Sequence, residues 1–144
     1  MTVRNILRSK GDDAVITLAP EASLLDAARL LAERRIGAVV ISPDGRRVLG
    51  ILSERDVVAR IAREGPAVLE RPVSEAMTTP VQTAAPGDKA RDCAQRMTTG
   101  RFRHMPVVED GVLVGLVSLG DVVNMRLGEI RAERDALEGM VMGR

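Results

Sequence analysis

Two stretches of the chain, GILSERDVV from Gly50 to Val58 and GLVSLGDVV from Gly115 to Val123, carry nearly the same residues in the same order. Each consists of a glycine, an apolar pair, a serine, two variable residues, an aspartate and two valines. The similarity extends upstream, because segment 17–41 aligns with segment 83–107 at a constant offset of 66, whereas the two stretches follow at an offset of 65. An internal repeat of this length predicts a fold that is built from two similar units.

The same pattern of elements is predicted in both units. Two apolar runs on either side of an Asp-Gly turn, 37–41 with 48–52 and 105–108 with 112–117, predict a β-hairpin. A short run ahead of the first helix (14–18 and 81–84) and a second helix after the S-x-x-D sequence (from Val57 and from Val122) complete a β-α-β-β-α unit. The first helix is predicted by apolar residues at i, i+3, i+4 and i+7, which are Leu24, Ala27, Ala28 and Leu31 in one unit and Ala90, Cys93, Ala94 and Met97 in the other.

A single unit of about 60 residues is only marginally stable by itself. We therefore expect an α+β fold in which two β-α-β-β-α units pack as a pseudo-two-fold pair. The expected units are residues 1–65 and 66–128, each preceded by a short helical piece (TVRNIL or PVSEAM), and residues 129–144 form a helical tail. The apolar residues of this tail are too sparse for a long coiled coil, so we expect it to pack on the domain or on a symmetry-related copy; they are Leu127, Ile130, Leu137 and Val141.

Composition excludes several classes of function. The formal net charge is +1, and Phe102 is the only aromatic residue, which disfavours nucleic-acid binding and ligand stacking on an aromatic platform. The single cysteine, Cys93, lies on an apolar helix face and rules out a disulfide within the chain or a multi-cysteine metal site. The N-terminus lacks the apolar region of a signal peptide, and no apolar run is long enough to cross a bilayer. We expect a cytoplasmic protein that contacts neither membrane nor nucleic acid.

The S-x-x-D sequences allow two interpretations. A serine followed three residues later by an acidic residue is typical of a capping box at a helix start. The same position also suits a sugar phosphate, because a helix N-terminus attracts phosphate and a nearby carboxylate can accept ribose hydroxyls. Arg55 favours the second interpretation, because a cation at a helix N-terminus is locally unfavourable without an anionic partner. Gly120 stands at the corresponding place in the second unit, so the two sites are expected to differ.

His104 is the only histidine of the chain. It has no second histidine or cysteine with which to form a zinc site, and the sequence lacks the nucleophile elbow that Ser-His-Asp chemistry needs. We expect it either on a solvent-facing strand or in a pocket. Nothing in the sequence indicates a catalytic residue.

The segments that carry a family resemblance are R-R-I-G-A-V-V-I, the two S-x-x-D stretches and P-V-S-E-A-M-T. With them, the repeat resembles a tandem pair of cystathionine β-synthase (CBS) domains, also called a Bateman module, of the kind found in small stand-alone bacterial proteins. The resemblance implies a homodimer and two clefts between the units, each able to take an adenine ligand such as AMP, ADP, ATP, NAD or S-adenosylmethionine. It implies that Asp56 and Asp121 hold ribose hydroxyls, that Ser53 and Ser118 face phosphate or ribose, and that Arg55 reaches phosphates. The residues that it places around the clefts and the adenine are Thr17, Ile36, Gly37, Ala38, Val39, Thr83, Arg103, His104, Met105 and Pro106.

These features favour a non-enzymatic regulatory module that senses adenine nucleotides (AMP, ADP or ATP) and signals to an as yet unknown partner protein. Alternatives are a sensor of NAD(H) or S-adenosylmethionine, a purely structural dimerisation scaffold, an enzyme that acts on a nucleotide, and a nucleic-acid binder. Balanced charge and the lack of aromatic residues disfavour the last of these.

Overall fold

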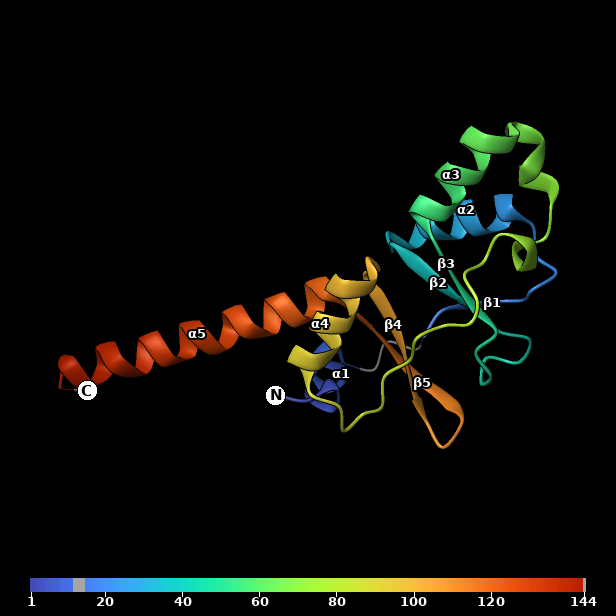
Figure 1. The fold of residues 1–144 in the computed structure, drawn as a ribbon. Helices are drawn as coiled ribbons and strands as arrows, with labels where there is room; N and C mark the ends of the chain where they lie inside the picture. The colour runs from blue at the N-terminus through green and yellow to red at the C-terminus, as the bar shows by residue number, and fades with distance from the viewer. Residues whose placement is uncertain (12–14, 144) are drawn as a thin grey trace.

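The computed structural model describes residues 1–11 and 15–143 and shows a mixed α and β fold with two small sheets (Figure 1). The helices are α1 (Val3–Lys10), α2 (Leu24–Arg34), α3 (Glu54–Glu64), α4 (Ala90–Gly100) and α5 (Leu119–Val141), with short 3-10 turns η1 (Pro66–Glu70) and η2 (Val73–Glu75) between α3 and α4. The strands are β1 (Thr17–Leu18), β2 (Ala38–Ile41), β3 (Gly50–Ser53), β4 (His104–Glu109) and β5 (Val112–Ser118).

The first unit contains a three-stranded sheet in the order β1-β2-β3, in which β1 runs parallel and β3 antiparallel to β2. In the second unit β4 and β5 form the corresponding hairpin. The predicted strand over 81–84 is wrong except for one bridge, Ala84 with Val107, which takes the place of the β1–β2 pairing. Only two backbone hydrogen bonds form at this bridge, and Pro80, which lacks an N–H group, precedes the short segment. Of the run predicted over 14–18, residue 14 lies outside the described residues.

Each unit has its own apolar core beneath its sheet. In the first unit α2, β2 and β3 supply the core, with Leu24, Ile41 and Leu52 almost fully buried. In the second unit α4, β4 and β5 do the same with Met97 and Met105. Cys93 belongs to this core, as expected, and burial, with a smaller contribution from Asp88, raises the pKa of its thiol, so that the reactive thiolate is disfavoured.

The helical pieces that precede the units pack on the opposite units. Val3 and Ile6 of α1 are buried in the core of the second unit, next to β5 and α5. Val68 of η1 and Val73 of η2 are buried in the core of the first unit. In Figure 1, α1 accordingly lies beside β5, and the chain that follows α3 runs back over the first unit. This exchange joins the two units through packing as well as through the connecting chain.

The second helix of each unit begins directly after the serine of S-x-x-D, three residues earlier than predicted, at Glu54 and at Leu119. α5 then continues without interruption to Val141, through most of the predicted tail, as a helix of 23 residues that projects from the body (Figure 1). Among the described residues, no helix has the length and apolar content needed to cross a membrane.

Candidate functional site

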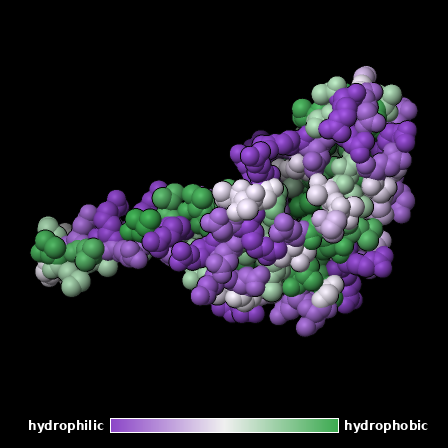
Figure 2. Space-filling view, in the orientation of Figure 1, coloured by the Kyte–Doolittle hydropathy of each residue, from purple (hydrophilic) through white to green (hydrophobic). Residues whose placement is uncertain are grey.

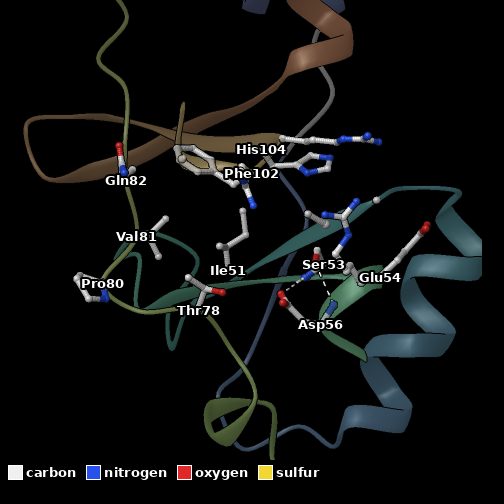
Figure 3. A pocket seen from close by; sticks show the side chains of 16 residues that line it. Ile51, Ser53, Glu54, Asp56, Thr78, Pro80, Val81, Gln82, Phe102 and His104 are labelled. Atoms are coloured by element: carbon white, nitrogen blue, oxygen red, sulfur yellow. Dashed lines mark hydrogen bonds between the residues drawn. The ribbon is translucent and has the colours of Figure 1, made fainter. Parts of the chain in front are cut away.

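A cleft of about 580 Å³ lies between the two units, within the range typical of small-molecule sites. One wall comes from the N-terminal turn of α3 and the start of β2 in the first unit. The opposite wall comes from the end of α4 and the start of β4 in the second unit, and the chain that follows η2 closes one side (Figure 3). The lining residues are Gly37, Ala38, Ile51, Ser53, Glu54, Arg55, Asp56, Thr78, Pro80, Val81, Gln82, Gly100, Arg101, Phe102, Arg103 and His104.

Ser53 and Asp56 form a reciprocal capping box at the start of α3. The Asp56 N–H donates to Ser53 Oγ at 3.2 Å, and the Ser53 N–H donates to Asp56 Oδ2 at 2.9 Å (Figure 3). The capping interpretation of S-x-x-D is thereby confirmed. Capping also fixes the carboxylate on the wall of the cleft, because Asp56 itself lines it.

Positively charged side chains line the same cleft as this carboxylate. Arg55, Arg101 and Arg103 line the cleft from both units, against the two carboxylates Glu54 and Asp56. Arg101 follows α4 in the left-handed conformation at φ 58°, as its counterpart Arg35 does after α2 at φ 53°. The N-terminal end of α3 adds the positive end of the helix dipole. The cleft therefore contains both groups that can bind an anion and a carboxylate that can accept hydrogen bonds from hydroxyl groups.

His104 lines the cleft at the start of β4 and is half-buried, in agreement with the pocket interpretation. Burial lowers its pKa below the ordinary value, with Lys10 and Arg103 acting in the same direction and Asp121 and Glu54 opposing them. A Cβ on Gly37 would lie 3.1 Å from the His104 ring, so the glycine allows the two units to approach at this point. Burial thus favours the neutral imidazole, which offers one hydrogen-bond donor and one acceptor.

Phe102, the single aromatic side chain, lies in the cleft (Figure 3). Composition disfavours ligand stacking on an aromatic platform, but this one aromatic ring does line the cleft. A Cβ on Gly100 would come within 2.4 Å of the Phe102 ring, so the ring position depends on this glycine. An aromatic face next to apolar Ile51 and Val81 suits a flat heterocycle.

The carboxylate of the second unit has a different environment. Ser118 and Asp121 form the same capping box, with bonds of 2.9 and 3.0 Å. Here Lys10 Nζ lies 2.9 Å from Asp121 Oδ2 and donates a second bond, also 2.9 Å long, to the Leu116 carbonyl. In the first unit the corresponding carbonyl, of Ile51, accepts from the Thr78 backbone N–H instead. Asp121 is thus paired with a cation that the chain itself supplies.

Seven of the residues that the sequence singled out line the cleft together: Gly37, Ala38, Ser53, Arg55, Asp56, Arg103 and His104. Val39 and Met105 are fully buried in the two cores, and Pro106 is buried in β4. Thr17 pairs with Val40 in the sheet. Ile36, Thr83, Ser118 and Asp121 do not line this cleft.

Sequence reasoning missed the residues from the connecting chain, Thr78, Pro80, Val81 and Gln82, because no repeat or motif covers them. It also missed Ile51, Glu54, Gly100, Arg101 and Phe102. Glu54 and Ile51 could have been found, since they lie inside or next to the S-x-x-D stretch. Arg101 was discernible as a neighbour of Arg103 just before a strand.

The model of the CBS domain family matches the chain twice, over residues 3–63 and 73–128. The CBS domain-containing protein CBSX3, mitochondrial, of Arabidopsis thaliana is 30% identical over 99% of this chain and 72% of its own length. A second Arabidopsis relative, CBSCBSPB1, is 29% identical over 96% of this chain, which spans only 24% of that protein.

Solved structures agree with the fold. The CBS-domain containing protein ATU1752 from Agrobacterium tumefaciens is 43% identical, with a TM-score of 0.83 over 88% of this chain and 99% of that one. The protein PAE2072 from Pyrobaculum aerophilum, complexed with AMP, is 26% identical (TM-score 0.73; 84% and 89% covered). The CBS domain pair of protein MJ0100, in complex with 5′-methylthioadenosine and S-adenosyl-L-methionine, is 25% identical (TM-score 0.78; 90% and 98% covered). This chain is a tandem pair of CBS domains and belongs to the CBS domain family.

Proposed function

We propose that the cleft between the two units binds an adenine nucleotide of the AMP, ADP or ATP type, and that the protein is a regulatory, non-catalytic module. The observation that carries the proposal is the juxtaposition of Asp56, held at the start of α3, with arginines from both units. Two similar proteins were crystallised with adenosine derivatives, one with AMP and one with S-adenosyl-L-methionine and 5′-methylthioadenosine.

In the proposed complex each group of the cleft has one role. Asp56 accepts hydrogen bonds from the ribose hydroxyls, while Arg55 and the N-terminal end of α3 bind phosphate. Phe102, Ile51 and Val81 contact the adenine ring, and neutral His104 forms a hydrogen bond at its edge. Three arginines against two carboxylates favour an anionic nucleotide over S-adenosylmethionine, whose sulfonium group carries a positive charge.

The signal would arise from the position of the cleft. A ligand that contacts both walls has a different affinity for each relative arrangement of the units, and that difference shifts their equilibrium. A partner protein would read the resulting surface. A homodimer and a cytoplasmic location are part of the same proposal.

Thermal unfolding tests the proposed binding of an adenine nucleotide. The compounds to be compared are AMP, ADP, ATP, NAD, NADH, adenosine and S-adenosylmethionine. A ligand at 100 times its dissociation constant stabilises the folded state by about 2.7 kcal/mol, so AMP, ADP or ATP should raise Tm by several degrees. We expect Asp56→Ala to abolish this rise. Arg55→Ala should weaken the binding of the phosphorylated ligands and leave the rise in Tm with adenosine unchanged.

Loss of a helix cap alone would also reduce the free energy of unfolding, by about 1 kcal/mol, and would therefore lower Tm. Asp26→Ala is the matched control, because Asp26 and Ser23 form the same capping box at α2, away from the cleft. It should lower Tm without ligand and retain the full rise with ligand. A protein whose Tm responds to none of these compounds would be a scaffold, and the proposal would then be wrong.

A further inference from the structure

Most of α5 extends beyond the body of the protein. Val122, in its first turn, is the buried residue of this helix. Leu127, Ile130, Leu137 and Val141 are 43%, 46%, 62% and 86% exposed. Apolar side chains are visible along the projecting helix and gather at its far end (Figure 2). The match to the CBS family ends at residue 128, so this apolar face lies mostly outside the residues that match the family.

The exposed side chains follow a heptad pattern. Val123, Leu127, Ile130, position 134, Leu137 and Val141 are separated by 4, 3, 4, 3 and 4 residues, and we call these six positions the seam. Such spacing places them on one line along the helix and is the pattern of a two-helix coiled coil. A helix segment of this length is marginal in water without a partner, so its stability calls for a covered seam.

Charge selects a second copy of this chain, in the opposite orientation. The one polar residue of the seam is Arg134, and a parallel pair would place it directly against its own copy. The residues that flank the seam would add like-charge pairs in that orientation, Arg126 with Arg131 and Glu133 with Glu138. An antiparallel pair separates Arg134 from its own copy and removes these four flanking pairs of the dimer, leaving one contact of Arg131 and one of Glu133 with the same residue of the other copy.

We propose that α5 pairs with α5 of a second copy as an antiparallel coiled coil centred near Ala132. This register pairs every seam position: Val123 with Val141, Leu127 with Leu137, and Ile130 with Arg134. The aliphatic stem of Arg134 covers Ile130, while its guanidinium group extends toward Glu133 of the other copy. Arg131 and Glu133 each face their own copy across the axis, but at the solvated rim of the pair, where such contacts cost little.

Distances between spin labels test the orientation. Single cysteines are introduced at Asn124, Arg131 and Glu138, which lie on the same flank of the seam, in a Cys93→Ala background that mimics Ala27 of the first unit. In the antiparallel pair the two labels at position 131 lie close together, about 3 Å apart along the axis. Labels at 124 and at 138 are separated along the axis by about 24 Å and about 18 Å, at 1.5 Å per residue. A parallel pair would give one common distance at all three positions.

We expect the shortest distance at 131, a longer distance at 138 and the longest at 124. In the full-length protein Ile130→Glu with Leu137→Glu should abolish the short distance, whereas Ala132→Glu with Ala136→Glu, which adds the same charge to the opposite face, should preserve it. Equal distances at the three positions, or no dipolar coupling at any of them, would overturn the proposal. Neither result bears on nucleotide binding, which the thermal measurements test separately.

Discussion

Asp56 and Asp121 stand at the same place in the two repeats, yet their surroundings differ. Both are held by a serine cap with nearly the same bond lengths. Asp121 is also paired with Lys10, a residue 111 positions away in the sequence. Since one cation already neutralises it, Asp121 is less available to ribose hydroxyls than Asp56 is.

We therefore predict one bound nucleotide per chain, at Asp56, and a second, weaker binding event when Lys10 is changed to Met. Methionine retains the aliphatic bulk of the lysine side chain and removes its charge. The partly exposed ion pair contributes about 0.2–1 kcal/mol, so Lys10→Met should fold normally. Calorimetric titration with AMP measures the stoichiometry. Weaker binding in Lys10→Met with no second event would mean instead that Lys10 contacts the ligand.

At the scale of elements, the exchange of α1 and the η1–η2 segment joins the two units. Ile6 of α1 is 1% exposed and packs in the core of the second unit, although it precedes the first unit in the sequence. Helix α1 carries Lys10 at its end, so the same packing places that lysine beside Asp121. The environment of the second carboxylate thus depends on a tertiary contact.

Ile6→Ala should destabilise the folded protein by about 2–5 kcal/mol, because it leaves a cavity in a closely packed core. Arg4→Ala on the exposed face of the same helix is the control, with an expected change within about 0.5 kcal/mol. Urea denaturation measures both. Equal stability of the two variants would show that α1 does not belong to the core of the second unit.

Features that local sequence determines were predictable, whereas features that depend on tertiary contacts were not. The helices and hairpins of both units were predictable, because their apolar spacing is local and occurs twice. The capping boxes were predictable from S-x-x-D. The exchange of α1, the pairing of Lys10 with Asp121 and the position of Phe102 were not, because each depends on how distant segments pack. Val39 and Met105 were assigned to the cleft from family resemblance, but in a strand neighbouring side chains point to opposite faces, and these two enter the cores.

At the scale of the whole molecule, the cleft exists because two units each contribute one wall. Neither unit alone combines Asp56 with Arg101, Phe102 and Arg103. The repeat supplies similar walls, and the residues in which the copies differ, above all Lys10, Arg55 and Gly120, make the two carboxylate sites unequal. The two carboxylate sites thus differ because a few residues differ between two otherwise similar units.

The most direct test of the central claim is equilibrium binding of AMP, measured by calorimetric titration of the purified wild-type protein, Asp56→Ala and Asp26→Ala. The account predicts saturable binding at one nucleotide per chain in the wild-type protein and in Asp26→Ala, and its loss in Asp56→Ala. Undiminished AMP binding in Asp56→Ala would contradict the account, because the nucleotide would then bind elsewhere than in the cleft between the two units.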